Sequence, residues 1–244
     1  MPLNRDQILE LLNAPERLEN LKRLIQTEPE PVRGQDVNNH IHTTYSFSPY
    51  SPTAAVYFAR QAGLCTCGLM DHDSIGGAEE FLTAAGIAGM GATIGTECRV
   101  SFRRTPFAGR RINNPDQDSI AYMAMHGIPH NKVKLVSEFF APYRALRNVR
   151  NRAMVSAVNE LLNKYGISLD FERDVLPLSQ YANGGSVTER HISSALAYKM
   201  IEKIGKGQPL VSFIRETMNL PLSAKIEGYL LDENNPHMMY DLLG

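Results

Sequence analysis

Side chains of the kinds that bind metal ions occur in ordered groups along the chain. Five of the seven histidines belong to these groups. Imidazole and carboxylate together suit ions such as Zn, Mn, Fe or Co, and several ions held side by side can activate water and clamp a phosphoryl group. The pattern therefore indicates metal-dependent hydrolysis, and its members are His40, His42, Asp71, His72, Glu97, His126 and His191.

Each group on its own is weak evidence. His40 and His42 are two residues apart, so in a strand both imidazoles point to one side. Asp71-His72 follows an apolar stretch, and the competing interpretation is a turn whose aspartate caps the next helix. Glu97 ends another apolar stretch, where a carboxylate is costly to bury unless it is paired or bound to a metal.

The elements that would position these groups alternate between strand-like and helical patterns from residue 36 onward. This alternation predicts an α/β fold with a parallel sheet or barrel. In such barrels the catalytic residues lie at the carboxyl ends of the strands, and each group of candidate ligands here lies at or near such an end. We expect strands over 37–42, 64–70, 92–100 and 123–126, with helices over 51–62 and 76–86 between them.

Other patterns flank this region. Residues 3–26 are helical in pattern with a break at Pro15, and the proline-rich stretch to residue 34 resembles a linker. A long helical pattern covers 144–165, and a further helix over 188–204 has Thr188 as a possible N-cap. We therefore expect a helical extension and linker (1–34), a first barrel part (35–136), a helical insertion (137–187) and a barrel continuation with elements missing (188–244).

Five short motifs in order resemble those of the PHP (polymerase and histidinol phosphatase) family of metal-dependent phosphoesterases, in its branch with a helical insertion. The resemblance covers about 36–136 and 186–205. It implies a distorted (β/α)7-type PHP barrel with two or three metal ions at its mouth. The motifs are His40–Ser46, Leu69–Gly77, Gly95–Glu97, Met125–Gly127 and Arg190–Leu196.

The resemblance also implies a role for each residue. His40 and His42 would bind one ion, which Glu97 would bridge to a second. His126 and His191 would complete the second ion's ligands, while His72 would belong to a third ion beside Asp71. The expected catalytic residues are Glu97, Asp71 and His72.

Two residues are candidates for binding substrate. Arg190 adjoins a predicted ligand and can match phosphate oxygens with its guanidinium group. His130 lies close to His126 in sequence; it is a substrate contact, an alternative metal ligand or a surface histidine.

The sequence departs from the family pattern in three places. Phe47 stands where the family has an aspartate that helps to hold the third ion. No Asp-x-His pair follows His191, and Arg190 directly precedes His191 where the family has Arg-Pro-His. Truncation and genuine degeneracy both explain the missing pair. We expect two divalent ions (Mn, Zn or Fe), with a third in doubt.

Composition bounds the partners. The net charge is -1 without a long basic run, so duplex nucleic acid is not expected as a partner. No stretch resembles a signal peptide or a membrane span. Three cysteines without zinc-site spacing indicate reduced, buried side chains in a cytoplasmic protein.

We expect hydrolysis of a small phosphate monoester or nucleotide, which makes a small phosphorylated molecule the partner. The alternatives are a degenerate, non-catalytic scaffold and a nuclease that trims oligonucleotides. A basic loop, Arg103, Arg104, Arg110 and Arg111, is either solvated surface or a phosphate clamp.

Overall fold

The chain forms two units in the computed structural model, which describes residues 3–115 and 117–232. The first unit contains residues 1–145 and 180–186, and the second contains 146–179 and the chain from 187 onward. The four-segment organisation expected from the sequence stays a prediction.

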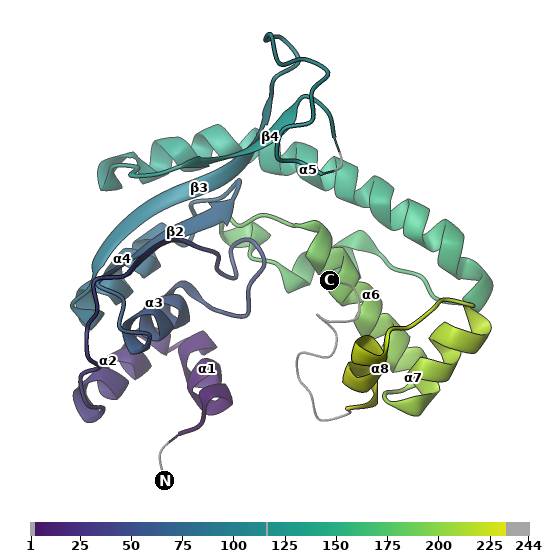
Figure 1. Cartoon of the computed structure of the whole chain (residues 1–244), viewed down its shortest axis with the longest axis horizontal. Coiled ribbons are helices and arrows are strands. Elements are labelled where there is room, and N and C mark those ends of the chain that lie inside the picture. Colours follow the sequence, from purple (N-terminus) through teal and green to yellow (C-terminus); the bar gives the residue numbers. More distant parts are fainter. Residues whose placement is uncertain (1–2, 116, 233–244) are drawn as a thin grey trace. The chain divides into compact units, whose positions relative to one another are not determined.

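A curled, half-barrel sheet of four strands is the centre of the first unit (Figure 1). The strand order is β1-β2-β3-β4. The first three strands run parallel, and β4 is antiparallel to β3. The strands are β1 (Val37–Ile41), β2 (Thr66–His72), β3 (Gly91–Ser101) and β4 (Ile120–Met125).

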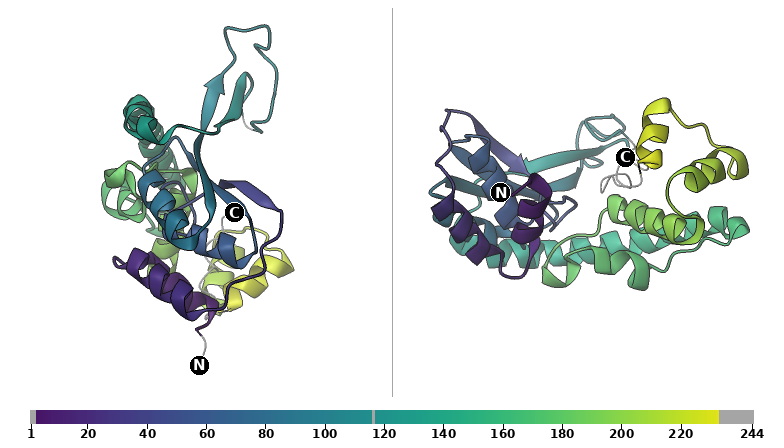
Figure 2. Two further views of the ribbon diagram at one scale, coloured as in Figure 1. Left: turned by 90° about the vertical axis from the view of Figure 1, so that its left-hand side faces the viewer. Right: turned by 90° about the horizontal axis from the view of Figure 1, so that it is seen from below.

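The direction of β4 corrects one expectation. A strand near 123–126 is confirmed, but its parallel orientation is wrong. A parallel neighbour needs a crossover connection, usually a helix, whereas the described residues between β3 and β4, 102–115 and 117–119, contain no helix. The connection stands out beyond the rest of the sheet in Figure 2.

Two helices alternate with the parallel strands, as the sequence predicts. In α3 (Pro52–Gln61) the Ser51 side chain accepts a hydrogen bond from the amide of Ala54, which confirms the predicted cap. The other helix, α4 (Ala78–Ala88), passes through Gly86, where its end was predicted, and stops at Gly89. Gly89 has φ 62°, a left-handed conformation in which glycine lacks the Cβ penalty.

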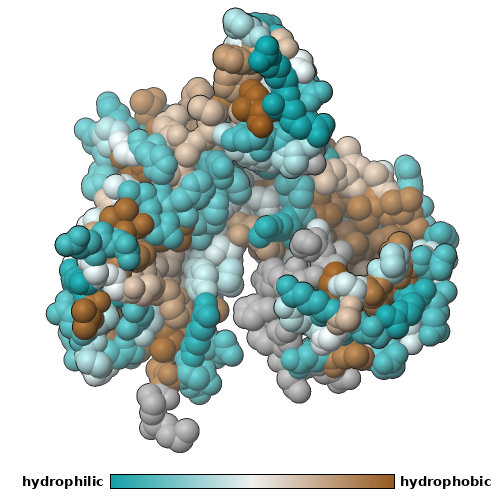
Figure 3. Space-filling model, viewed as in Figure 1, coloured by the Kyte–Doolittle hydropathy of each residue, from teal (hydrophilic) through white to brown (hydrophobic). Residues whose placement is uncertain are grey.

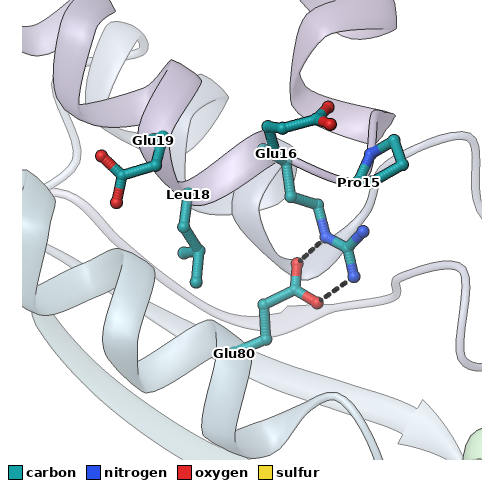
Figure 4. Close-up of a pocket in the computed structure, with 6 residues that line it drawn as sticks. Pro15, Glu16, Leu18, Glu19 and Glu80 are labelled. Carbon is teal, nitrogen blue, oxygen red and sulfur yellow. Dashed lines mark hydrogen bonds and ion pairs between the residues drawn. The ribbon is translucent and has the colours of Figure 1, made fainter.

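The N-terminal segment is a pair of helices, α1 (Arg5–Asn13) and α2 (Arg17–Thr27), separated at Pro15 as predicted. Leu12 and Leu21 are fully buried in the same core cluster as residues of α3 and α4. Arg17 Nε and Nη2 each donate to Glu80 of α4 at 2.7 Å (Figure 4). The pair therefore joins the N-terminal helices to α4. Arg17 and Glu80 both line the surface pocket in that view, where their charged groups bind each other.

The remaining helices belong mostly to the second unit. The long helix α5 (Val133–Leu162) begins in the first unit, eleven residues before the predicted start, and Pro142 lies inside it. The others are α6 (Glu189–Ile204), α7 (Gln208–Ser212) and α8 (Ala224–Leu231), with 3-10 turns at His130–Lys132, Asn163–Tyr165, Leu176–Leu178 and Tyr181–Asn183 and π turns at Phe171–Val175 and Phe213–Thr217.

A separate core stabilises the second unit. Leu162, Met200 and Leu210 belong to one buried cluster, so α5, α6 and α7 share apolar contacts. Among the described residues, every helix is too short or too polar to cross a bilayer. The three cysteines, all in the described part, form no disulfide; Cys67 is buried, whereas Cys65 and Cys98 are half-buried.

Candidate metal centre

Three imidazoles surround one carboxylate oxygen, Oε2 of Glu97. His72 Nδ1 lies 3.3 Å from it, His40 Nε2 lies 3.5 Å away and His42 Nε2 lies 3.8 Å away. His40 belongs to β1, His42 directly follows that strand, and His72 ends β2. Three sequence motifs therefore meet at one point.

Sheet register creates this meeting. His72 pairs with Glu97 in the ladder between β2 and β3, so Glu97 lies level with the end of β2 although it is in the middle of β3. The rings of His42 and His72 stack with centroids 4.6 Å apart and planes 24° apart. The shared edge thus brings the ends of β1 and β2 to one carboxylate.

The donor set fits a divalent metal ion. The ligand atoms of His40, His42 and Glu97 all lie within 4.8 Å of one another. Zn–N and Zn–O bonds of about 2.0–2.2 Å allow one ion to reach atoms spaced in this way after small side-chain adjustments. The Glu97 side chain is 17% exposed and that of His40 is 45% exposed, so solvent can reach the centre.

Asp71 positions the segment that follows His42. It is fully buried, and its carboxylate accepts hydrogen bonds from the Thr43 amide (2.6 Å), the Thr43 hydroxyl (2.6 Å) and the Ser46 hydroxyl (2.7 Å). Burial raises the pKa of Asp71, while the bonds from Ser46 and Thr43 act in the opposite direction. Asp71 therefore ties the end of β2 to the loop after β1.

The loop after β2 is braced by an arginine. Asp73 has φ 48°, a conformation that aspartate tolerates better than most residues, and its carbonyl accepts a hydrogen bond from Arg144 Nη1 at 3.2 Å. Burial lowers the pKa of Arg144, whose side chain comes from the first-unit end of α5. This arginine supports the loop that directly follows His72.

His126 and His130 lie outside the three-residue group defined above. His126 follows β4 and is exposed. Because β4 is antiparallel, Met125 pairs with Thr96, so the end of β4 lies on the amino-terminal side of Glu97 in β3. His130 is exposed and begins a 3-10 turn. Their predicted roles as metal ligand and substrate contact stay predictions.

His191 and Arg190 belong to the second unit. Arg190 is exposed. His191 is buried at the start of α6, where its Nδ1 accepts a hydrogen bond from the Thr188 amide at 2.9 Å. Burial lowers the pKa of His191 to about 4, so the ring is neutral at pH 7. His191 thus caps α6, and its predicted ligand role stays a prediction.

Several residues around the centre carry weak signals in the sequence. Thr43, Ser46 and Tyr122 have unremarkable side chains, although Thr43 and Ser46 lie inside the first motif. Tyr122 lies with its ring centroid 6.3 Å from that of His72 and accepts a hydrogen bond from Arg99 Nη2 at 2.9 Å. Alternation along β4 could have placed Tyr122 on the same face of the sheet as His72, but only if the antiparallel register of β4 had been known. The later histidine, His237, lies outside the described residues.

Comparison with known proteins supports the fold. No known protein-family model matches the chain, and no curated protein matches its sequence. The fold is similar to that of a Bifidobacterium adolescentis protein assigned as a metal-dependent phosphoesterase, with a TM-score of 0.51 and 20% sequence identity over 82% of this chain. The matched region covers 63% of that protein, so this chain spans less than two thirds of the relative's length.

A second solved structure is an amidohydrolase from Chromobacterium violaceum, with bound sulfate and no metal. It matches with a TM-score of 0.49 and 20% identity, over 73% of this chain and 54% of that one.

Proposed function

We propose that this chain is a PHP-type metal-dependent phosphoesterase that hydrolyses a small phosphate monoester or nucleotide. The observation that carries the proposal is the convergence of His40, His42 and His72 on Oε2 of Glu97. The fold shared with a protein assigned to this activity adds support. The half-barrel sheet is, in this proposal, part of a distorted PHP barrel.

Two divalent ions, with Mn, Zn or Fe as candidates, would supply a Lewis acid for phosphoryl oxygens and a bound water acidic enough to attack phosphorus at neutral pH. His40, His42 and Glu97 would hold the first ion. His126 and His191 would complete the second ion's ligands, and His72 would serve a third.

The chain's own residues organise the reaction. Glu97 is half-buried and lies close to three imidazoles, so its carboxylate would bind an ion together with them. Asp71 holds the His42 segment through Thr43, which limits the rearrangement needed on binding. Arg190 and His130 are proposed to bind the substrate phosphate.

The test measures metal content and hydrolysis together. The purified protein, incubated with Mn and desalted, is assayed for metal per chain and for hydrolysis of p-nitrophenyl phosphate. We expect bound metal and turnover, with both reduced at least 10-fold in His40→Ala. Gln26→Ala, an exposed change on α2, is the control that retains both.

The same experiment decides between this proposal and a non-catalytic scaffold. Phe47 and the missing Asp-x-His pair motivate that alternative. Metal bound in the wild type but lost in His40→Ala, with no hydrolysis by either, would favour the scaffold. If His40→Ala keeps both the bound metal and the activity, the assignment of the metal centre is wrong.

A further inference from the structure

We propose that the connection between β3 and β4 is an arm that binds the backbone of a single-stranded nucleic acid and leads it to the Glu97 centre. The arm consists of residues 102–115 and 117–119, all in the first unit. The catalytic part of this inference rests on the proposed function, whereas binding by the arm is measurable without it.

Positive charge is concentrated on the arm in a chain of net charge -1. Arg103, Arg104, Arg110 and Arg111 are all exposed. Arg111 Nε lies 3.5 Å from Asp118 Oδ1, but both side chains are more than half exposed, so this pair costs little to open. The arm therefore offers guanidinium groups to phosphate oxygens, which they match in a bidentate fashion.

Aromatic surface accompanies the charge. Phe107 is 52% exposed, and its ring meets that of Phe102 edge-on with centroids 6.3 Å apart. Figure 3 shows hydrophilic and hydrophobic residues intermixed on this projecting part of the first unit. Arginines beside an exposed aromatic ring are the combination that binds single strands, because bases stack on the ring while cations follow the backbone.

The arm is held by its own hydrogen bonds. The Phe102 amide donates to the Ser119 carbonyl (2.7 Å), and the Ser119 amide donates to the Arg110 carbonyl (2.8 Å). Asn113 pairs through both side-chain groups with the backbone of Tyr122, each bond 2.9 Å long, along the edge of β4. An arm ordered before binding loses less conformational entropy when it takes a ligand.

One face of the sheet connects the arm to the centre. Glu97, Arg99 and Ser101 alternate along β3 and so lie on one face, over about 14 Å. Arg99 pairs in register with Tyr122 and hydrogen-bonds to its hydroxyl, and the Tyr122 ring lies 6.3 Å from that of His72. Arg99 therefore places one positive charge on the face between the arm and the Glu97 centre.

This continuity favours a nucleic acid strand over an anionic membrane. Membrane binding would use the same arginines but gives no reason for Arg99 and Tyr122 to extend the path to His72. A strand with several phosphates uses the arm and the centre together. The expected ligand of the arm is then a single-stranded oligonucleotide, in addition to the small phosphate esters of the proposed function.

Fluorescence anisotropy with 5'-labelled deoxythymidine oligomers tests the inference. The full chain is titrated at low salt with EDTA present, so that hydrolysis does not interfere. We expect affinity to rise with length from two to about eight nucleotides. The double variant Arg103→Ala/Arg104→Ala should bind the longest oligomer about 10-fold or more weakly. Its slope of log K against log salt should be smaller by about 0.7 for each phosphate that the arm no longer neutralises.

Two further variants sharpen the result. Lys22→Ala/Arg23→Ala removes two exposed charges from α2 and should leave binding within 2-fold of the wild type. Phe107→Ala should weaken binding about 5-fold or more, because a base can no longer stack on the ring. Thermal midpoints of all variants are measured alongside, and a variant that unfolds is replaced by Arg110→Ala/Arg111→Ala.

The outcomes separate this inference from the proposed function. Length-independent affinity, or equal losses of affinity in the arm and α2 double variants, overturns the inference even if p-nitrophenyl phosphate is hydrolysed. Arm-dependent, length-dependent binding supports it even if no hydrolysis is found, and then only the proposed function fails. Binding of phosphatidylserine vesicles through the arm without length-dependent oligomer binding also overturns it.

Discussion

The Asp71 carboxylate accepts two hydrogen bonds from Thr43, one from its amide and one from its hydroxyl, each 2.6 Å long. Thr43 follows His42 in sequence, and Asp71 precedes His72. One buried carboxylate thus joins the two segments that bring imidazoles to Glu97. This relationship makes a side chain outside the imidazole cluster important for its geometry.

Replacing Asp71 by Asn should weaken both the fold and metal binding. The amide has one oxygen instead of two, so a buried donor of Thr43 or Ser46 loses its acceptor, which costs about 1–3 kcal/mol of unfolding free energy. Mn affinity should fall about 10–100-fold because the His42 segment is no longer held. Urea unfolding and calorimetric titration measure the two effects. Asp36→Asn, at an exposed position, should change neither, and an unchanged Mn affinity in Asp71→Asn would refute the positioning role.

Metal binding at the Glu97 centre should stabilise the protein. An ion that binds only the folded state at 100 times its dissociation constant adds about 2.7 kcal/mol. We expect Mn or Zn to raise the thermal midpoint and EDTA to reverse the rise. His42→Ala should abolish the shift, whereas Gln26→Ala should retain it. A shift of equal size in His42→Ala would place the bound ion elsewhere.

The contact between Arg17 and Glu80 should contribute to the stability of the first unit. Glu80 also accepts hydrogen bonds from the Thr53 amide (3.1 Å) and hydroxyl (2.8 Å) at the start of α3. Glu80→Ala removes all of these acceptors at once and should cost about 1–3 kcal/mol. Arg17→Ala should cost less because Thr53 keeps its acceptor. Urea unfolding measures both.

Lys22→Ala is the matched control for Arg17→Ala, since its partner Glu19 is 61% exposed, and should cost less than about 0.5 kcal/mol. Equal costs for Arg17→Ala and Lys22→Ala would show that the contact with Glu80 adds nothing beyond a surface pair.

Acid should destabilise the second unit partly through Asp174. Burial acts to raise the pKa of Asp174, but hydrogen bonds from Arg173 and the Asp170 amide, with Lys199 3.5 Å away, outweigh it and hold the pKa below its ordinary value. A depressed carboxyl pKa contributes stability that is present above the unfolded pKa of about 3.9 and is lost as the pH falls through the folded pKa.

The variant Asp174→Asn should therefore show a shallower loss of stability between about pH 5 and pH 3 than the wild type. Unfolding midpoints across this range measure it. Glu160→Gln, an exposed change on α5, should keep the wild-type slope. If Asp174→Asn also keeps that slope, the ion pairs of Asp174 do not contribute to acid sensitivity.

Much of the first unit could be predicted from its sequence. Strand β2 and helices α3 and α4 have clear local signals: a buried apolar run, a Ser-Pro start and glycines near the ends. Strand β1 has only the short Val37–His42 pattern. The start of α5 was predicted at residue 144, whereas the helix begins at Val133 and contains Pro142, a residue that is ordinarily costly within a helix. The direction of β4 depended on the path of residues 102–119, which carries no local signal of direction.

The sequence by itself determined the chemical types of the ligands and the strands that carry them, because these depend on residue identity and short-range periodicity. Only the tertiary structure decided that His40, His42 and His72 meet one oxygen of Glu97, that Asp71 faces Thr43 and Ser46, and that Tyr122 joins the same face. These relationships depend on strand register and direction, which are set by pairing between segments far apart in the chain.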